Sequence, residues 1–208
     1  MSQVAPPAAN SPYEVHRTVL PAVLTARKLL GEGAEVGVRQ GEFSVHILQN
    51  WQGRKLWLVD AWRDLPGYAE AHHQHEQNYE ITMAKMRAFP GRYEVLRDMS
   101  VPAAAKFTDG SLDFIYLDAD HSYESVKADL DAWYPKLKIG GLLAGDDYGA
   151  LALHTVDFGQ GKLTFGVKKA VDEFALQHQK NVSIDWLGDW WFGTTMGQIR
   201  ARNWYLIK

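Results

Sequence analysis

The chain of 208 residues contains no cysteine, so it has no disulfide framework, no thiolate metal site and no cysteine nucleophile. It also lacks an apolar run near the roughly 18 to 20 residues that a membrane-spanning helix needs. A formal charge of only −3 leaves no strong electrostatic footprint for nucleic acid or an anionic membrane. The N-terminus has no basic segment followed by an apolar one, which is the pattern of a secretory signal. We therefore expect a cytoplasmic protein with neither membrane nor nucleic-acid partners.

What the chain does contain is an ordinary globular mixture, with 46% hydrophobic and 23% charged residues. This composition excludes a disordered or fibrous protein. Residues 1–12 are mostly Pro, Ala, Ser and Asn, and we expect them to form a disordered tail. The remaining length suits one domain, residues 13–208.

Helical and strand-like patterns alternate along the chain. Spacing of apolar residues predicts helices at 13–30, 42–51, 68–89, 101–107, 122–137 and 166–177. Apolar runs between breakers predict strands at 34–38, 55–61, 92–97, 112–117, 142–145, 182–186 and 203–207. Pro21 fits the first turn of the first helix, and Gly140-Gly141 ends the fifth. This order predicts an α/β protein with a doubly wound, mainly parallel seven-stranded sheet of Rossmann type and helices on both faces.

In such a sheet ligands bind beyond the carboxyl ends of the strands, so the residues that follow each strand are the candidates. The first strand leads through Glu35 into a turn with Gly37 and Gly41, whose backbone amides can approach a ligand closely. The turn departs from the dinucleotide fingerprint GxGxxG, and Glu35 would repel a pyrophosphate. It suits a ligand with cationic, amine or hydroxyl groups. The alternative is a tight turn that binds nothing.

The second and third strands also end in polar residues. Asp60 follows the glycine turn by about twenty residues, where an acid can accept hydrogen bonds from ribose hydroxyls. Asp98 and Ser100 stand where a short polar segment can border an adenine ring. All three residues could instead cap the helices that follow them.

Acidic residues are concentrated after the fourth and fifth strands, which we expect to be neighbours. They are Asp118, Asp120, Asp146 and Asp147, with His121 beside them. So much negative charge in one place is unfavourable unless a cation neutralises it. Oxygen ligands favour a hard ion, Mg²⁺ first, with Mn²⁺ or Ca²⁺ as alternatives. The competing interpretation is that Asp120 or Ser122 caps the next helix while Asp146 and Asp147 turn into solvent.

With these residues in view, the chain resembles class I S-adenosylmethionine-dependent methyltransferases between about Gly33 and Phe174. The likeness is to the metal-dependent small-molecule O-methyltransferases of the macrocin and novobiocin type. The segments that carry it are EVGVRQGEFS (35–44), LVDAW (58–62), LDFIYLDADHSYESVKADLDAWYPKLKIGGLLAGDDY (112–148) and GVKKAVDEF (166–174). The third segment is the most specific, both in its residues and in the spacing of its acidic side chains.

The resemblance implies a role for each candidate. Glu35, Gly37 and Gly41 would lie along the methionine part of the cofactor, Asp60 would hold its ribose, and Asp118 would also bind the cofactor. Asp98 and Ser100 would lie near the adenine. The resemblance places the metal ligands on Asp118, Asp146 and Asp147.

The resemblance also assigns the deprotonation of the acceptor to Asp120. His121 is a second candidate from chemistry alone, because free imidazole titrates near neutral pH. The reaction implied is transfer of a methyl group from the sulfonium of S-adenosylmethionine to a hydroxyl of a small molecule, a sugar or a natural product. A Mg²⁺ or similar ion would act on that hydroxyl as a Lewis acid.

The sequence also bears on three other functions. A nicotinamide-dependent oxidoreductase is disfavoured by the incomplete glycine fingerprint, by Glu35 and by the lack of a Tyr-x-x-x-Lys pair. Methylation of a nucleic-acid base is disfavoured by the acidic charge and by the absence of an (Asn/Asp)-Pro-Pro-(Tyr/Phe) segment after the fourth strand. A non-catalytic cofactor-binding protein stays open as an alternative.

The acceptor pocket is expected from Tyr148–Phe165, with His154 and Phe158, and from the polar stretch Pro66–Tyr79. Within that stretch His72, His75 and Glu76 form a solvated polar face rather than a metal site. The aromatic residues near the end of the chain pack in the core or in a homodimer interface. They are Trp186, Trp190, Trp191 and Trp204.

Overall fold

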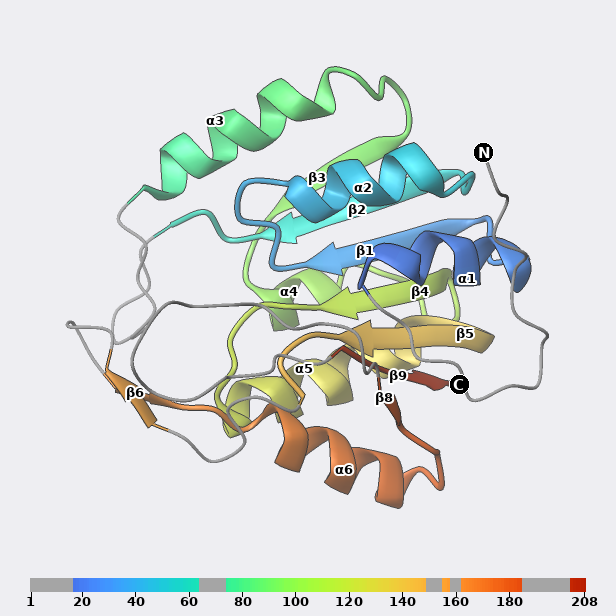
Figure 1. The fold of residues 1–208 in the computed structure, drawn as a ribbon, viewed down its shortest axis with the longest axis vertical. Helices are drawn as coiled ribbons and strands as arrows, with labels where there is room; N and C mark the ends of the chain where they lie inside the picture. The colour runs from blue at the N-terminus through green and yellow to red at the C-terminus, as the bar shows by residue number, and fades with distance from the viewer. Residues whose placement is uncertain (1–16, 64–73, 149–154, 158–161, 185–202) are drawn as a thin grey trace.

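The computed structural model describes residues 17–63, 74–148, 155–157, 162–184 and 203–208. In this part of the chain a seven-stranded sheet lies between two layers of helices (Figure 1). Its strands are β1 (Glu32–Val36), β2 (Lys55–Asp60), β3 (Tyr93–Arg97), β4 (Leu112–Leu117), β5 (Leu137–Gly145), β8 (Ser183–Ile184) and β9 (Trp204–Ile207). The helices are η1 (Arg17–Val19), α1 (Leu20–Ala26), α2 (Glu42–Asn50), α3 (His75–Met86), α4 (Ser100–Ala104), α5 (Tyr123–Trp133), η2 (Tyr134–Lys136) and α6 (Val167–Gln177).

The strand order is β3-β2-β1-β4-β5-β9-β8. Strands β1 to β5 pair in parallel, and β9 runs antiparallel to both β5 and β8. From β1 the chain builds outward to β2 and β3, then returns to the other side of β1 with β4. The predicted doubly wound, mainly parallel seven-stranded sheet is therefore confirmed. Its point of reversal lies between the carboxyl ends of β1 and β4, where ligands bind in such folds.

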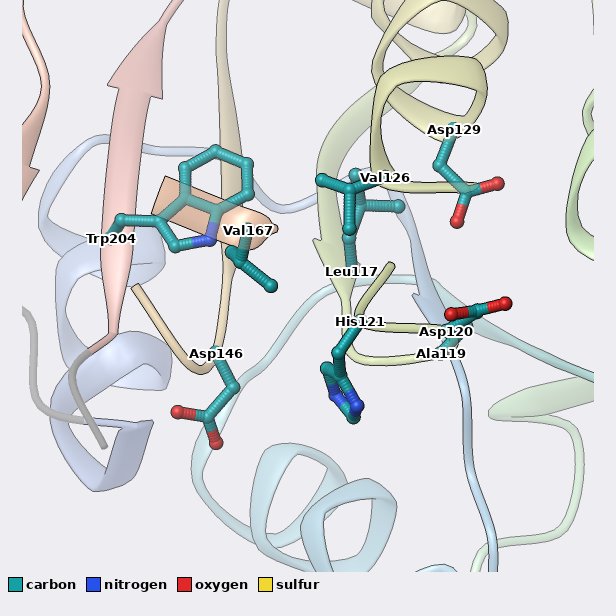
Figure 2. A pocket seen from close by; sticks show the side chains of 9 residues that line it. All are labelled: Leu117, Ala119, Asp120, His121, Val126, Asp129, Asp146, Val167 and Trp204. Carbon is teal, nitrogen blue, oxygen red and sulfur yellow. The ribbon is translucent and has the colours of Figure 1, made fainter. Parts of the chain in front are cut away.

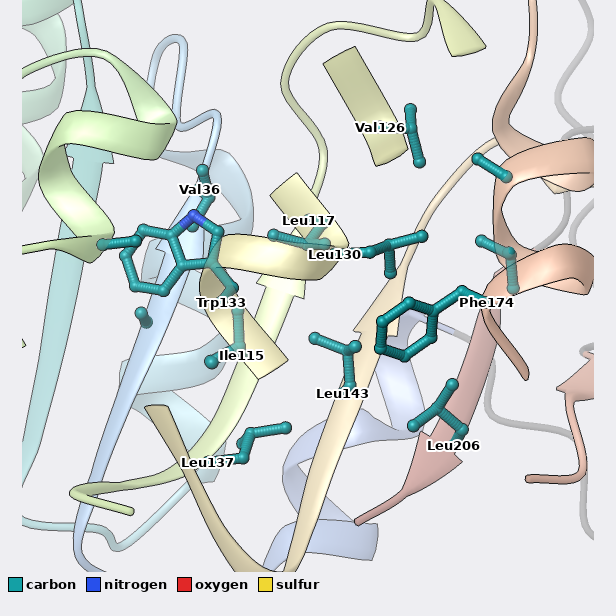
Figure 3. Packing of buried hydrophobic residues seen from close by; sticks show 14 of the residues in the cluster. Val36, Ile115, Leu117, Val126, Leu130, Trp133, Leu137, Leu143, Phe174 and Leu206 are labelled. Carbon is teal, nitrogen blue, oxygen red and sulfur yellow. The ribbon is translucent and has the colours of Figure 1, made fainter. Parts of the chain in front are cut away.

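Strand β4 is the centre of the hydrophobic core. All six of its residues are buried, as expected for a parallel strand covered on both faces. Phe114 and Tyr116 pack on the side of α1, α2 and α3, while Ile115 and Leu117 pack on the side of α5 and α6. Figure 3 shows the second side, where Ile115 and Leu117 face the side chains of α5 and α6. Burial on both faces holds the end of β4 firmly in place.

The N-terminal helix is shorter than predicted. Residues 1–12, the expected tail, and residues 13–16 lie outside the described residues. The α-helix begins at Leu20 with Pro21 in its first turn, as predicted, but it ends at Ala26 rather than at Leu30. Lys28 takes a φ of 60°, which is incompatible with helix and turns the chain toward β1.

The fifth strand is longer than predicted, and the helix before it is shorter. Helix α5 ends at Trp133, a 3₁₀ turn containing Pro135 follows, and β5 starts at Leu137. Gly140 and Gly141 lie inside the strand as an irregularity, and the β4–β5 register shifts between Leu112 and Phe114. The interpretation of this glycine pair as a helix breaker was wrong, because a positive φ of 79° at Gly140 accommodates the irregularity.

Two further features lie outside the main sheet. Strands β6 (Thr155–Asp157) and β7 (Lys162–Thr164) form a small antiparallel hairpin that the sequence patterns did not predict. The described part of the expected helix at 68–89 is α3, which starts at His75. Among the described residues, no helix has the length and apolar character that crossing a membrane requires.

Candidate active site

The loop after β1 passes directly over the end of β4. Gly37 and Gly41 have positive φ values of 90° and 74°, a conformation that side chains disfavour. A Cβ atom on Gly37 would lie 1.9 Å from the carbonyl oxygen of Asp118. Only glycine permits this approach, so the predicted glycine turn and Asp118 are brought together. The backbone of the glycine loop, with no side chain at Gly37 or Gly41, therefore lies at the point where the sheet reverses direction.

Glu35 lies beneath this loop inside the sheet. It is 1% exposed, and its Oε2 accepts a hydrogen bond of 2.5 Å from the Ser44 hydroxyl on α2. Burial raises the pKa of Glu35 to about 8, against the smaller opposing effects of Ser44 and the Arg17 charge. At neutral pH its protonated, uncharged form predominates. Glu35 was expected to place a negative charge beside the loop. At neutral pH it is mostly uncharged instead.

Asp60 holds the same loop from the end of β2. Its Oδ2 accepts hydrogen bonds of 2.9 Å from the backbone N–H groups of Val38 and Arg39, and its Oδ1 accepts one of 2.8 Å from Trp62. The carboxylate therefore orders the glycine loop. Oδ1 still has a lone pair that can accept a hydrogen bond.

Asp98 and Ser100 follow β3 and point in different directions. Asp98 forms an ion pair of 2.8 Å with Lys106, which holds the pKa of this carboxyl below its usual value. The Ser100 hydroxyl donates to Asp129 at 2.5 Å and accepts from the Trp133 indole at 2.9 Å. Burial raises the pKa of Asp129 to about 7. The side chain of Ser100 thus joins α4 to α5.

Three groups from the ends of β4 and β5 converge on one point. His121 Nε2 lies 3.1 Å from Asp147 Oδ2 and 3.5 Å from Asp118 Oδ1. One ligand atom from each of Asp118, His121 and Asp147 lies within 4.8 Å of the others. The imidazole stacks on Phe165, with ring centroids 5.2 Å apart. The predicted metal triad was Asp118, Asp146 and Asp147. The observed cluster contains His121 instead of Asp146.

Asp146 faces Arg17, which sequence reasoning missed. Arg17 Nη1 lies 3.2 Å from Asp118 Oδ2 and 3.2 Å from Asp146 Oδ2. Burial and repulsion by Asp118 raise the pKa of Asp146, whereas the pKa of Asp118 is low because His121 and Arg17 outweigh its burial. No local pattern marks Arg17, because its partners are more than one hundred positions away.

Asp120 stands next to His121 in the sequence but is turned away from it. Its Oδ1 accepts from the Ser122 backbone N–H at 2.7 Å and its Oδ2 from the Ser125 hydroxyl at 2.8 Å. These are capping contacts at the first turn of α5, so the structure gives Asp120 the role that the sequence left as the alternative. Figure 2 shows its carboxylate directed toward Asp129 rather than toward Asp146.

A small hollow, with room for about one water molecule, lies between the ends of β4 and β5 and the starts of α5 and α6 (Figure 2). Its lining residues are Leu117, Ala119, Asp120, His121, Val126, Asp129, Asp146, Val167 and Trp204. Trp204 is 1% exposed, and its Nε1–H has no hydrogen-bond partner among the described residues. Figure 2 shows this nitrogen on the edge of the indole that faces Val167 and the hollow.

Several predicted features fall wholly or partly outside the described residues. His72, His154 and Phe158 do, and so do Trp186, Trp190 and Trp191. The hollow contains none of the described residues of the expected acceptor segments. Glu76 pairs with Arg97 at 2.5 Å with 65% of its side chain exposed, which agrees with a solvated face, whereas His75 is half-buried. Trp204 packs in the core.

A family model described as a methyltransferase domain matches residues 34–148, which is more than half of the chain. The chain belongs to this family. The matched region contains the glycine loop, Asp60 and the whole acidic cluster. The predicted resemblance to class I S-adenosylmethionine-dependent methyltransferases is confirmed, and the oxidoreductase alternative is set aside.

Individual relatives of this methyltransferase domain are distant. An uncharacterized protein, y4gI, from Sinorhizobium fredii is 27% identical over 114 residues, which are 55% of the chain but only 12% of that protein. An O-methyltransferase from Bacillus cereus in complex with S-adenosylhomocysteine has a TM-score of 0.60 and 14% identity, over 92% of this chain and 80% of that one. An rRNA methylase from Streptococcus thermophilus has a TM-score of 0.59 and 11% identity, over 94% and 99%. These similarities show the fold, which serves different acceptors.

Proposed function

We propose that this methyltransferase domain transfers the methyl group of S-adenosylmethionine to a hydroxyl of a small molecule, a sugar or a natural product, with the help of a divalent cation. The observation that carries the proposal is the convergence of Asp118, His121 and Asp147 within 4.8 Å. This cluster adjoins the glycine loop, so a proton acceptor and cation ligands lie next to the place where the cofactor would bind. Positioning of the sulfonium beside the hydroxyl would supply much of the rate.

The cofactor would lie across the loop after β1. Gly37 and Gly41 leave room for it, Glu35 and Asp118 would border its methionine part, and Asp60 would accept from its ribose through the free lone pair of Oδ1. At the adenine end the turn after β3 would supply Asp98 at its rim. Ser100 would shape that turn through its bonds to Asp129 and Trp133.

The donor groups at the rim fit a hard divalent ion, Mg²⁺ or Mn²⁺, since carboxylate oxygens are the preferred ligands of both. Asp118 and Asp147 would hold it, with Asp146 as the third oxygen ligand predicted from the resemblance. When bound, the ion would supply a Lewis acid that lowers the pKa of the acceptor hydroxyl. The Trp204 N–H, which has no partner among the described residues and lines the hollow together with Asp146, also fits a site that receives an oxygen atom.

We assign the proton transfer to His121 rather than to Asp120. The Asp120 oxygens both accept hydrogen bonds from the start of α5. His121 Nε2 lies 3.1 Å from Asp147 Oδ2 and donates to it, so Nδ1 would be the atom that takes the proton of the acceptor. The two neighbouring carboxylates stabilise the imidazolium that forms when His121 takes a proton. His121 therefore acts as the base, and Asp120 organises the helix that carries it.

The test uses tritium-labelled S-adenosylmethionine with a panel of phenols and monosaccharides, with Mg²⁺ or with EDTA. We expect O-methyl products by mass spectrometry and their loss in EDTA. His121→Gln should lower kcat by roughly 10²–10⁴ and remove the acidic limb of the pH profile, while S-adenosylhomocysteine binding stays unchanged. Absence of O-methyl products from the whole panel would contradict the proposal, and full turnover in EDTA would remove the cation from it.

A further inference from the structure

A guanidinium group stands between the two carboxylates that end β4 and β5. The same nitrogen of Arg17, Nη1, is 3.2 Å from Asp118 Oδ2 and 3.2 Å from Asp146 Oδ2. The side chains of the two acids are only 19% and 16% exposed. Arg17 thus occupies the position between two of the three carboxylates that the resemblance assigns to a metal ion.

Aromatic rings complete the surroundings of this cation. The Arg17 guanidinium carbon lies 4.4 Å from the centre of the Phe43 ring and 5.7 Å from that of Tyr116. Both distances allow favourable cation–π attraction. Burial alone would lower the pKa of Arg17, but the surrounding negative groups reverse the effect and keep the pKa above its usual value. The group is therefore always charged.

Asp118 and Asp146 require a positive group between them, either the Arg17 guanidinium or another cation. Asp118 Oδ2 and Asp146 Oδ2 both lie 3.2 Å from Arg17 Nη1, so without a positive group between them the two carboxylates would repel each other. A divalent ion on the same oxygens would neutralise them equally well. It could not do so with the guanidinium still in contact, because two positive groups would then share one small, partly buried space.

We propose that Arg17 is a positioning residue that competes with the divalent cation. In the ion-free protein its guanidinium holds Asp118 and Asp146, and it leaves them when an ion is bound. This inference rests on the proposed function, which includes the ion. Arg17 lies outside the family-matched region 34–148, yet it would have a direct effect on the affinity for the ion.

The exchange requires only a movement of the Arg17 side chain. Backbone next to Arg17 is anchored, because the Thr18 carbonyl oxygen lies 2.7 Å from His46 Nε2 on α2. Leu20 and Leu24 are fully buried and fix α1 against the sheet. The arginine side chain is 32% exposed, so it can rotate toward solvent without unfolding either helix.

The test measures Mn²⁺ binding without cofactor, by the electron paramagnetic resonance signal of free Mn²⁺. We expect Arg17→Gln to lower the Kd for Mn²⁺ by about tenfold or more, because a competing charge is removed. Arg17→Lys keeps the charge and should stay close to the wild-type value. Arg54→Gln is the matched control, because Arg54 pairs with Glu32 at the opposite end of β1.

The outcomes separate this inference from the function on which it rests. Equal or weaker Mn²⁺ binding by Arg17→Gln, with wild-type binding intact, would overturn the role of Arg17 and leave the metal site standing. Absence of Mn²⁺ binding in every variant would remove the metal site itself. If Arg17→Gln folds poorly, Arg17→Ala and wild type are compared with each other, both at saturating S-adenosylhomocysteine, and the same two results decide.

Discussion

Glu35 illustrates how position rather than residue type sets charge at this site. In the sequence it is an acid beside a glycine turn, which suggests a negative group facing a ligand. In the fold it lies inside the sheet with the Ser44 hydroxyl as partner, and its pKa rises to about 8 because of burial. The negative charge at the site comes instead from Asp118, whose pKa stays below its usual value because of His121 and Arg17.

This raised pKa has a consequence for stability. Between the unfolded value of 4.5 and the folded value of about 8, the folded protein binds more protons than the unfolded one. The free energy of unfolding therefore falls as pH rises through that window. Glu35 alone should make the protein roughly 2 kcal/mol less stable at pH 7 than at pH 5.

Denaturation by guanidinium chloride at pH 5, 6, 7 and 8 measures this effect. Glu35→Gln keeps the shape of the side chain and its partner Ser44 but cannot ionise, so it should flatten the dependence. Glu94→Gln, on the exposed side of β3, is the matched control and should not. A pH dependence unchanged by Glu35→Gln would show that Glu35 does not titrate in this range.

At the scale of elements, α5 separates two adjacent residues that the sequence left together as candidates. The helix begins after the turn that contains Asp120 and His121, and Ser122 caps it by accepting from the Ser125 backbone N–H at 3.3 Å. Asp120 turns into this cap while His121 turns outward to Asp147. One local hydrogen-bond pattern thus decides which of the two can take part in chemistry.

Asp120→Ala should therefore be a stability variant. Loss of the bonds to Ser122 and Ser125 should cost about 1 kcal/mol, seen as a fall in Tm of roughly 2–4 °C. Cofactor binding and turnover should stay within a few-fold of wild type. Asp131→Ala, at an exposed position on the same helix, should leave Tm unchanged. A loss of activity as large as that of His121→Gln would return the base to Asp120.

At the scale of the whole molecule, the sequence patterns predicted the sheet because its central strands are mostly apolar runs ended by glycine or acid. Strand β4, with every residue buried, is an example. The start of β5 was missed because Gly140 and Gly141 resemble a helix end unless the irregular pairing with β4 is known. Local patterns report local conformation and do not report which strand is the neighbour.

The site was predictable as a set of residues but not as an arrangement. Gly37, Asp118 and Asp147 follow from the rule that ligands bind at strand ends. The contact of Arg17 with two acids more than one hundred positions away follows only from the packing of α1 against the sheet. For the same reason, the exchange of Asp146 for His121 in the cluster became visible only in three dimensions.

The account depends on a cofactor bound across the loop after β1, beside the acidic rim. A calorimetric titration with S-adenosylhomocysteine tests this most directly, using wild type, Gly37→Ala and His121→Gln. We predict saturable one-to-one binding to wild type and to His121→Gln. Gly37→Ala should lose it, because its Cβ would lie 1.9 Å from the Asp118 carbonyl oxygen and displace the loop. Absence of binding to the wild-type protein, or unchanged binding to a folded Gly37→Ala variant, would contradict the account.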